Sequence, residues 1–134
     1  MVLPNQLRLV LVTPEQTLLD EPVDALRFPL YDGQIGILPG RAPLVGRLGY
    51  GELKITRGTE ERIYFVDGGF VQVKGEVVTL LTNQAIPAER INPASAEEQL
   101  RKAQSRIPTK PHEFAAKERD QERARRMLAV AKAR

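Results

Sequence analysis

Hydrophobic and polar residues alternate along the first two thirds of the chain. The alternation is clear from Leu7 to Leu11, at Leu53 and Ile55, and at Val71 and Val73. A spacing of two residues indicates β-strands with one buried face. We therefore expect strands near residues 6–13, 16–20, 22–29, 34–38, 44–48, 50–57, 61–67, 70–74 and 76–82.

Turn-forming residues separate these runs, and all ten glycines lie between Gly33 and Gly75. The dipeptides Glu21-Pro22 and Arg57-Gly58 and the triplet Asp67-Gly68-Gly69 each predict a turn. Many short strands at this spacing are typical of a sandwich or barrel. Because residues 63–66 and 77–81 are apolar on both faces, some outer sheet face must be covered by the rest of the chain or by a partner.

After Pro87 the hydrophobic spacing becomes helical. Asn92 before Pro93 predicts a capped helix start, and Ser95 with Glu98 offers a competing capping box. The residues from Pro108 to Pro111 end this helix, and a second one begins near His112. The apolar stripe of the first helix consists of Ala96, Leu100, Ala103 and Ile107, and that of the second of Phe114, Gln121, Ala124, Leu128 and Ala131.

The second helix has a thin apolar stripe and a broad charged face. Most helix stability in proteins comes from burying an amphipathic face, so we expect this helical hairpin to be held weakly and to be able to detach. The predicted fold class is thus mainly β plus α: an N-terminal flattened β-sandwich of about ten strands, residues 1–87, followed by a C-terminal antiparallel α-helical hairpin, residues 88–134.

Composition narrows the function classes. The 134 residues include no Cys and a single His, His112, which excludes disulfides, thiolate nucleophiles and multi-His metal sites. Asp32 and Asp67 each precede a glycine, a position typical of turns rather than of acid–base catalysis. We expect a protein that is not an enzyme and that holds no metal or cofactor.

Charge is distributed unevenly. Residues 1–87 carry 8 Lys and Arg against 10 Asp and Glu, whereas residues 88–134 carry 12 against 7. A basic helical tail suits nucleic acid, an anionic membrane or an acidic protein surface. Interleaved acidic residues and a single tail aromatic, Phe114, argue against nucleic acid. A free cytosolic β-domain whose tail binds RNA or anionic lipid remains the alternative. The apolar run from Leu7 to Val12 is too short for a membrane span, so we expect a protein kept in the cytosol.

Three blocks in order resemble one known family. They are residues 33–44, with the pattern Gly-x-Ile-Gly-Ile-Leu-Pro-Gly-x-Ala-Pro-Leu, residues 65–73 and residues 78–81, followed by a tail of two helices. Together they resemble the epsilon subunit of the F-type ATP synthase. The resemblance implies a flattened sandwich with a helical hairpin and a noncatalytic rotor subunit of the central stalk. It further implies binding to gamma and the c-ring, coupling of proton or sodium flow to ATP synthesis, and a place at the cytoplasmic face of the bacterial inner membrane.

The resemblance also assigns contact residues. Gln34 and Arg41 stand where many relatives have an acidic residue and His, so the charge facing the ring differs. The c-ring contact comprises Gln34, Ile35, Gly36, Ile37, Leu38, Pro39, Arg41 and Pro43. The gamma contact comprises Phe70, Val71, Val73, Val78 and Leu80.

The helical hairpin carries two further expectations from the resemblance. In some members it extends along gamma, and basic residues of its last helix meet the catalytic alpha and beta subunits and block ATP hydrolysis. The corresponding residues here are Arg119, Arg123, Arg125, Arg126 and Lys132. Some members also bind ATP through an Ile/Leu-Asp-x-x-Arg-Ala motif, which aligns with Ile91, Asn92 and Ser95. Since Asp has become Asn92 and Arg has become Ser95, we expect weak or absent ATP binding.

Overall fold

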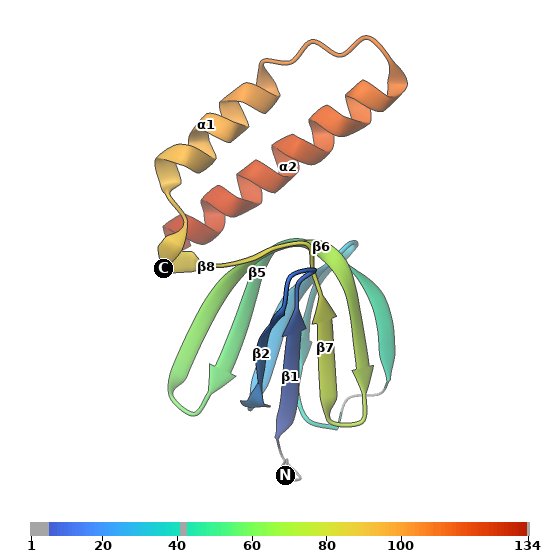
Figure 1. Ribbon diagram of the computed structural model, residues 1–134, viewed down its shortest axis with the longest axis vertical. Helices are drawn as coiled ribbons and strands as arrows, with labels where there is room; N and C mark the ends of the chain where they lie inside the picture. Colours follow the sequence, from blue (N-terminus) through green and yellow to red (C-terminus); the bar gives the residue numbers. More distant parts are fainter. Residues whose placement is uncertain (1–5, 41–42, 134) are drawn as a thin grey trace.

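The computed structural model describes residues 6–40 and 43–133 and consists of a β-sandwich with a helical hairpin projecting from one end (Figure 1). This confirms the predicted fold class. The strands are β1 (Leu7–Val12), β2 (Thr17–Val23), β3 (Ala25–Leu30), β4 (Gly33–Ile37), β5 (Leu44–Arg57), β6 (Glu60–Lys74), β7 (Val77–Leu81) and β8 (Ala85–Pro87). A 3-10 turn, η1 (Ala88–Arg90), leads into the helices α1 (Pro93–Gln104) and α2 (Pro111–Ala133).

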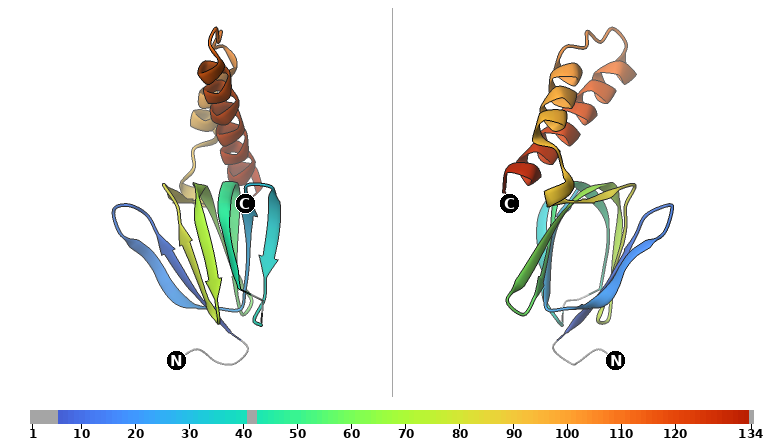
Figure 2. Two further views of the ribbon diagram at one scale, coloured as in Figure 1. Left: turned by 90° about the vertical axis from the view of Figure 1, so that its right-hand side faces the viewer. Right: turned by 60° about the vertical axis from the view of Figure 1, so that its left-hand side comes forward.

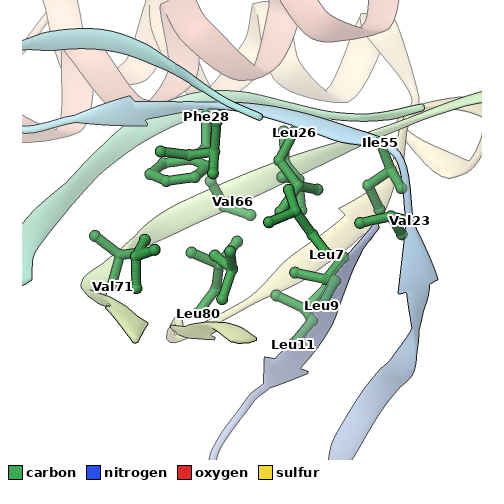
Figure 3. Close-up of a cluster of buried hydrophobic side chains, with 14 of the residues drawn as sticks. Leu7, Leu9, Leu11, Val23, Leu26, Phe28, Ile55, Val66, Val71 and Leu80 are labelled. Atoms are coloured by element: carbon green, nitrogen blue, oxygen red, sulfur yellow. The ribbon is translucent and has the colours of Figure 1, made fainter. Parts of the chain in front are cut away.

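The strands form one continuous sheet in the order β2-β1-β7-β6-β5-β3-β4, and β8 also pairs with β6. The sheet curls round so that its two halves face each other (Figure 2). β1 and β7 run parallel, whereas the other pairs are antiparallel. As predicted, the side chains of β1 alternate, with Leu7, Leu9 and Leu11 fully buried. These leucines point into the core between the two halves, together with Phe28, Val66 and Leu80 (Figure 3).

Two long strands replace four of the predicted short ones, so residues 6–40 and 43–133 contain eight strands rather than about ten. The predicted turn at Asp67-Gly68-Gly69 is wrong, because β6 continues through it and bends. Gly69 has φ +116°, and a Cβ there would collide with the carbonyl oxygen of Leu81. The inward residues shift from Tyr64 and Val66 before the bend to residues 71 and 73 after it. β5 and β6 therefore arch over the end of the sandwich that lies below the helices (Figure 1).

The predicted break at Glu21-Pro22 is also wrong, since both residues lie within β2. β2 is an edge strand, and proline, which has no N–H to donate, is tolerated where one side of a strand has no partner. The short strand β8 was not predicted, because its three residues are too few to show a hydrophobic period.

The helical hairpin starts as the sequence predicts. The Asn92 side chain accepts hydrogen bonds from the backbone N–H of Ala94 at 2.9 Å and of Ser95 at 3.3 Å. The competing start at Ser95 is therefore wrong. Ile107 lies beyond the end of α1 and is 87% exposed, and Phe114 is also exposed, so neither belongs to a buried stripe as predicted.

Candidate functional site: the docked helical hairpin

The C-terminal part of α2 rests on the arch formed by β5 and β6. The interface is a small apolar cluster that is separate from the sandwich core. Phe65 is its largest fully buried side chain. Its other members are two alanines and Ile91 from the segment that runs from η1 into α1 and residues from the last turns of α2, whereas the first half of α2 extends away from the sandwich (Figure 2). The buried cluster comprises Phe65, Ala88, Ile91, Ala96, Met127, Val130 and Ala131.

One ion pair accompanies this apolar contact. The Arg123 Nε atom lies 2.9 Å from Asp67 Oδ1, and the Arg123 guanidinium lies 5.4 Å from the centre of the Tyr50 ring. Asp67 is only 8% exposed. A buried carboxylate is costly without a partner, so Arg123 supplies the charge that Asp67 requires. Sequence reasoning treated Asp67 as a turn residue and missed this contact.

The backbone of Asp67 is fixed independently of the helices. Its N–H is shared between the Thr82 hydroxyl and the Gln84 carbonyl, each at 3.1 Å. The Asn83 side chain donates to the Asp67 carbonyl, also at 3.1 Å. All three partners lie in the connection between β7 and β8. The backbone of Asp67 is therefore positioned by the sandwich, whereas its carboxylate pairs with Arg123 of α2.

The Asp120 carboxylate on α2 lies close to three guanidinium groups. Arg106 Nη1 lies 2.6 Å from Asp120 Oδ2, whereas Arg119 Nε and Arg123 Nη1 lie 3.1 and 3.5 Å from Asp120 Oδ1. Burial by itself raises the pKa of Asp120, but hydrogen bonds from Arg106 and Arg119 and the charges of both outweigh it. The pKa of Asp120 is lowered as a result, so this carboxyl group stays ionised while the hairpin is closed.

All five predicted inhibitory residues have an acidic partner. Arg125 and Arg126 pair with Glu122 at 3.3 and 2.6 Å, and all three residues lie on α2. Lys132 lies 3.7 Å from Glu97 of α1. The pairs of Arg119, Arg125 and Arg126 would travel with α2 if it left the sandwich, whereas the Arg123–Asp67 pair would break.

The predicted c-ring segment coincides with the edge strand β4 and the residues after it. Gln34 and Gly36 are exposed, Ile35 is half-buried and Leu38 is 64% exposed. Ile37 is fully buried in the core, so the prediction that it contacts the ring is wrong, because strand alternation points it inward. Of the remaining predicted contact residues, Pro39 is half-buried and Pro43 is exposed, while Arg41 lies outside the described residues.

Four of the five residues predicted to contact gamma do not reach the surface. The alternation of β6 and β7 turns them inward, and these core residues are Val71, Val73, Val78 and Leu80. On the same strands Phe70, Val77 and Leu81 face outward, Phe70 with 57% of its surface exposed. Phe70 and Leu81 line a groove of about 500 Å³ that also includes Tyr31. The residues predicted to contact gamma thus lie on the strands that carry this outward face, but four of them point into the core.

The residues of the altered ATP motif line a cavity of about 370 Å³ between the sandwich and the helices. Ile91 is buried, and the side-chain oxygen Oδ1 of Asn92 accepts the hydrogen bonds that cap the helix. Arg90 and Arg123 also line the cavity, together with Asp67, which already pairs with Arg123. A phosphate entering here would therefore meet a carboxylate as well as guanidinium groups.

Within residues 6–40 and 43–133, no group of three or more His, Cys, Asp and Glu side chains is placed to hold a metal ion. Across the same described residues, neither helix combines the length and apolar character needed to span a bilayer.

Comparison with known proteins places the chain in a family. A model of the ATP synthase delta/epsilon chain β-sandwich domain matches residues 6–88. An ATP synthase epsilon chain from Rhodopirellula baltica is 40% identical over 126 residues, which is 94% of this chain and 98% of that relative. One from Rubrobacter xylanophilus is 32% identical over 125 residues, 93% of this chain and 84% of that relative. The chain belongs to the ATP synthase epsilon chain family, which confirms the resemblance found in the sequence.

Solved structures share the fold. A chain of the Euglena gracilis mitochondrial ATP synthase, in an assembly of OSCP, F1 and c-ring, aligns with a TM-score of 0.87 and 26% identity, covering 97% of this chain and 84% of that one. A chain from the Tetrahymena thermophila mitochondrial ATP synthase central stalk and c-ring aligns with a TM-score of 0.76 at 14% identity, covering 93% of this chain and 96% of that one. The second match concerns the fold alone.

Proposed function

We propose that this chain is a noncatalytic rotor subunit in the central stalk of an F-type ATP synthase, linking gamma to the c-ring and coupling ion flow to ATP synthesis. The observation that carries the proposal is that relatives named ATP synthase epsilon chain align over both the sandwich and the helices. The Euglena match comes from an assembly that contains F1 and a c-ring. The complex holds the chain at the cytoplasmic face of the bacterial inner membrane.

The c-ring contact is assigned to the β4 edge. β4 ends the ladder, and among the described residues it pairs only with β3, so its second edge is free to face a partner. Gln34, Gly36 and Leu38 are exposed there. The loss of an acidic residue at Gln34 makes this contact depend on backbone and apolar groups rather than on an ion pair.

The gamma contact is assigned to the outer face of β6 and β7. Phe70, Val77 and Leu81 lie on neighbouring strands, with Phe70 directly opposite Leu81 in the ladder. Exposed apolar groups gathered on one face of a sheet are typical of a protein interface. The groove beside them adds Tyr31, whose ring stacks 4.7 Å from the Arg47 guanidinium.

The helical hairpin is assigned the role of an inhibitor of ATP hydrolysis. Arg125 and Arg126 are more than half exposed and pair only within α2. They therefore remain a basic patch when α2 leaves the sandwich. An acidic segment of the catalytic subunits is the partner that this charge favours.

Hydrolysis by the cognate catalytic complex depleted of this subunit tests both assignments. We expect the full chain to bind and inhibit, and a chain ending at Pro87 to bind without inhibiting. Arg125→Gln with Arg126→Gln should weaken inhibition, whereas the matched change of Arg101 and Lys102 on α1 should not. If neither form binds, the rotor assignment is wrong; if both bind and neither inhibits, the inhibitory role is wrong.

Nucleotide sensing is not assigned to the chain. We expect calorimetry to show no tight ATP binding to the isolated protein, because the motif carries Asn92 and Ser95 in place of Asp and Arg. The alternative of a tail that binds RNA or anionic lipid predicts association with a steep dependence on salt. The tail has a single aromatic residue, Phe114, on which a base could stack, and this disfavours RNA.

A further inference from the structure

The charged contact between α2 and the sandwich is concentrated at one place. Among the described residues, Arg123–Asp67 is the only ion pair that joins α2 to the strands. The two residues are 56 positions apart in the chain. Since the rest of the interface is a small apolar cluster, this pair supplies most of its directional specificity.

The two partners differ in how they reach the contact. The backbone of Asp67 is held by the connection between β7 and β8, and these backbone contacts do not involve the helices. Arg123 arrives only with α2. Docking therefore brings a mobile cation to a nearly buried carboxylate, and undocking leaves that carboxylate to water.

Arg123 lies one turn of α2 before Arg126 and is also one of the basic residues that the family resemblance predicts to contact the catalytic subunits. One guanidinium cannot pair with Asp67 and with an external acidic segment at the same time, so the two contacts exclude each other. We propose that Asp67 competes with the acidic partner surface for Arg123. The Asp67–Arg123 pair, here called the latch, keeps the helical hairpin docked and thereby opposes inhibition. The second half of this proposal rests on the inhibitory function proposed above.

Asp120 connects the Asp67–Arg123 pair to the rest of the helical hairpin. It contacts Arg123 on its own helix and Arg106 in the connection after α1. The Arg106 carbonyl in turn accepts a hydrogen bond from Lys117 Nζ at 2.9 Å. The series Asp67, Arg123, Asp120 and Arg106 thus links docking on the sandwich to closure of the two helices against each other.

The latch can be tested on the full isolated chain by energy transfer. Because the chain has no Cys, Asp32→Cys and Ala115→Cys place two dyes at unique exposed positions, one on the sandwich and one on α2. We expect Asp67→Asn to raise the ratio of undocked to docked chain about tenfold, as the loss of one charge-assisted hydrogen bond implies. Asp20→Asn is the matched control, since it removes a carboxylate 2.7 Å from Arg8 that is remote from the helices.

Arg123→Gln breaks the same ion pair from the side of α2. It tests the proposal even if Asp67→Asn disturbs the strands, because Arg123 lies on the helix surface. It should undock the hairpin to the same extent, and the double variant should undock no further than either single one. The proposal is overturned if both single variants stay docked like the wild-type chain, or if their effects simply add.

Hydrolysis by the reconstituted catalytic complex separates the two halves of the proposal. Asp67→Asn should inhibit several-fold more strongly than the wild-type chain, and Arg123→Gln less strongly than Asp67→Asn, because it loses a contact with the partner. Undocking without any change in inhibition would support the latch and overturn the inhibitory function.

Discussion

The sandwich core and the interface beneath α2 are both apolar, but they are built from different residues. Among the described residues the core buries fifteen side chains, all of them Leu, Ile, Val or Phe, on strands that hydrogen-bond to one another. The interface buries seven, of which three are alanines, and the helices reach the strands without a shared ladder. Since stabilisation scales with buried apolar area, we expect the sandwich to be stable alone and the helical hairpin to be able to leave it.

The largest expected effect comes from the core. Leu9→Ala removes a fully buried side chain from the middle of β1 and should lower the free energy of unfolding by about 2–5 kcal/mol. Urea denaturation followed by circular dichroism measures this change. Val45→Ala, on the exposed side of β5, should change it by less than about 0.5 kcal/mol. Equal effects of the two substitutions would contradict the described core.

A charge placed in the interface should separate the two regions. Val130→Asp puts an unpaired carboxylate into the cluster around Phe65, so we expect α2 to undock while urea unfolding of the strands stays nearly unchanged. Energy transfer between the labelled positions reports the undocking. Ala129→Asp adds the same charge at the exposed neighbouring position and should leave α2 docked. Loss of the sandwich in Val130→Asp would show that the two regions unfold together.

A smaller effect concerns the start of α1. Asn92→Ala removes the cap of the backbone N–H groups of Ala94 and Ser95 and should cost the helical hairpin about 1 kcal/mol. Hydrogen exchange of the α1 amides detects it. Asn92→Asp keeps the capping oxygen and should behave like the wild-type chain. Equal protection of α1 in the Ala variant would mean that the cap contributes little.

The smallest effect is the pH dependence of hairpin closure. Because the pKa of Asp120 is lowered in the folded state, its contribution is complete above the unfolded pKa of about 4 and is lost as the pH falls through the lower folded value. Protection of the α2 amides, measured as a function of pH, should therefore decline below about pH 4. Asp120→Asn should remove this part of the decline, and an unchanged profile would count against the Asp120 contacts.

The strands could be predicted where hydrophobic alternation is regular, as at Leu7, Leu9 and Leu11. The bend of β6 could not, because Asp67-Gly68-Gly69 has the composition of a turn, and only the passage beside Leu81 shows why glycine is needed. Alternation does place Asp67 on the same face of β6 as Phe65, and this could have indicated that Asp67 faces the helical hairpin. It was outweighed by the local preference of Asp before Gly for turns.

The candidate site could be predicted only in part for a similar reason. The basic residues of α2 are visible in the sequence, but their partners depend on contacts between distant segments, such as Arg123 with Asp67. Four of the five residues predicted to contact gamma are buried, because the sequence does not show which of two neighbouring apolar residues, such as Phe70 and Val71, faces outward.

Native-state hydrogen exchange of the full chain in low concentrations of urea measures whether the helices open separately from the strands. We expect two cooperative units: amides of α1 and α2 exchange through an opening of lower free energy and smaller urea dependence, whereas amides of β1, β5, β6 and β7 exchange only on global unfolding. One common free energy and one urea dependence for helices and strands would contradict this expectation, because the helical hairpin could then not leave an intact sandwich.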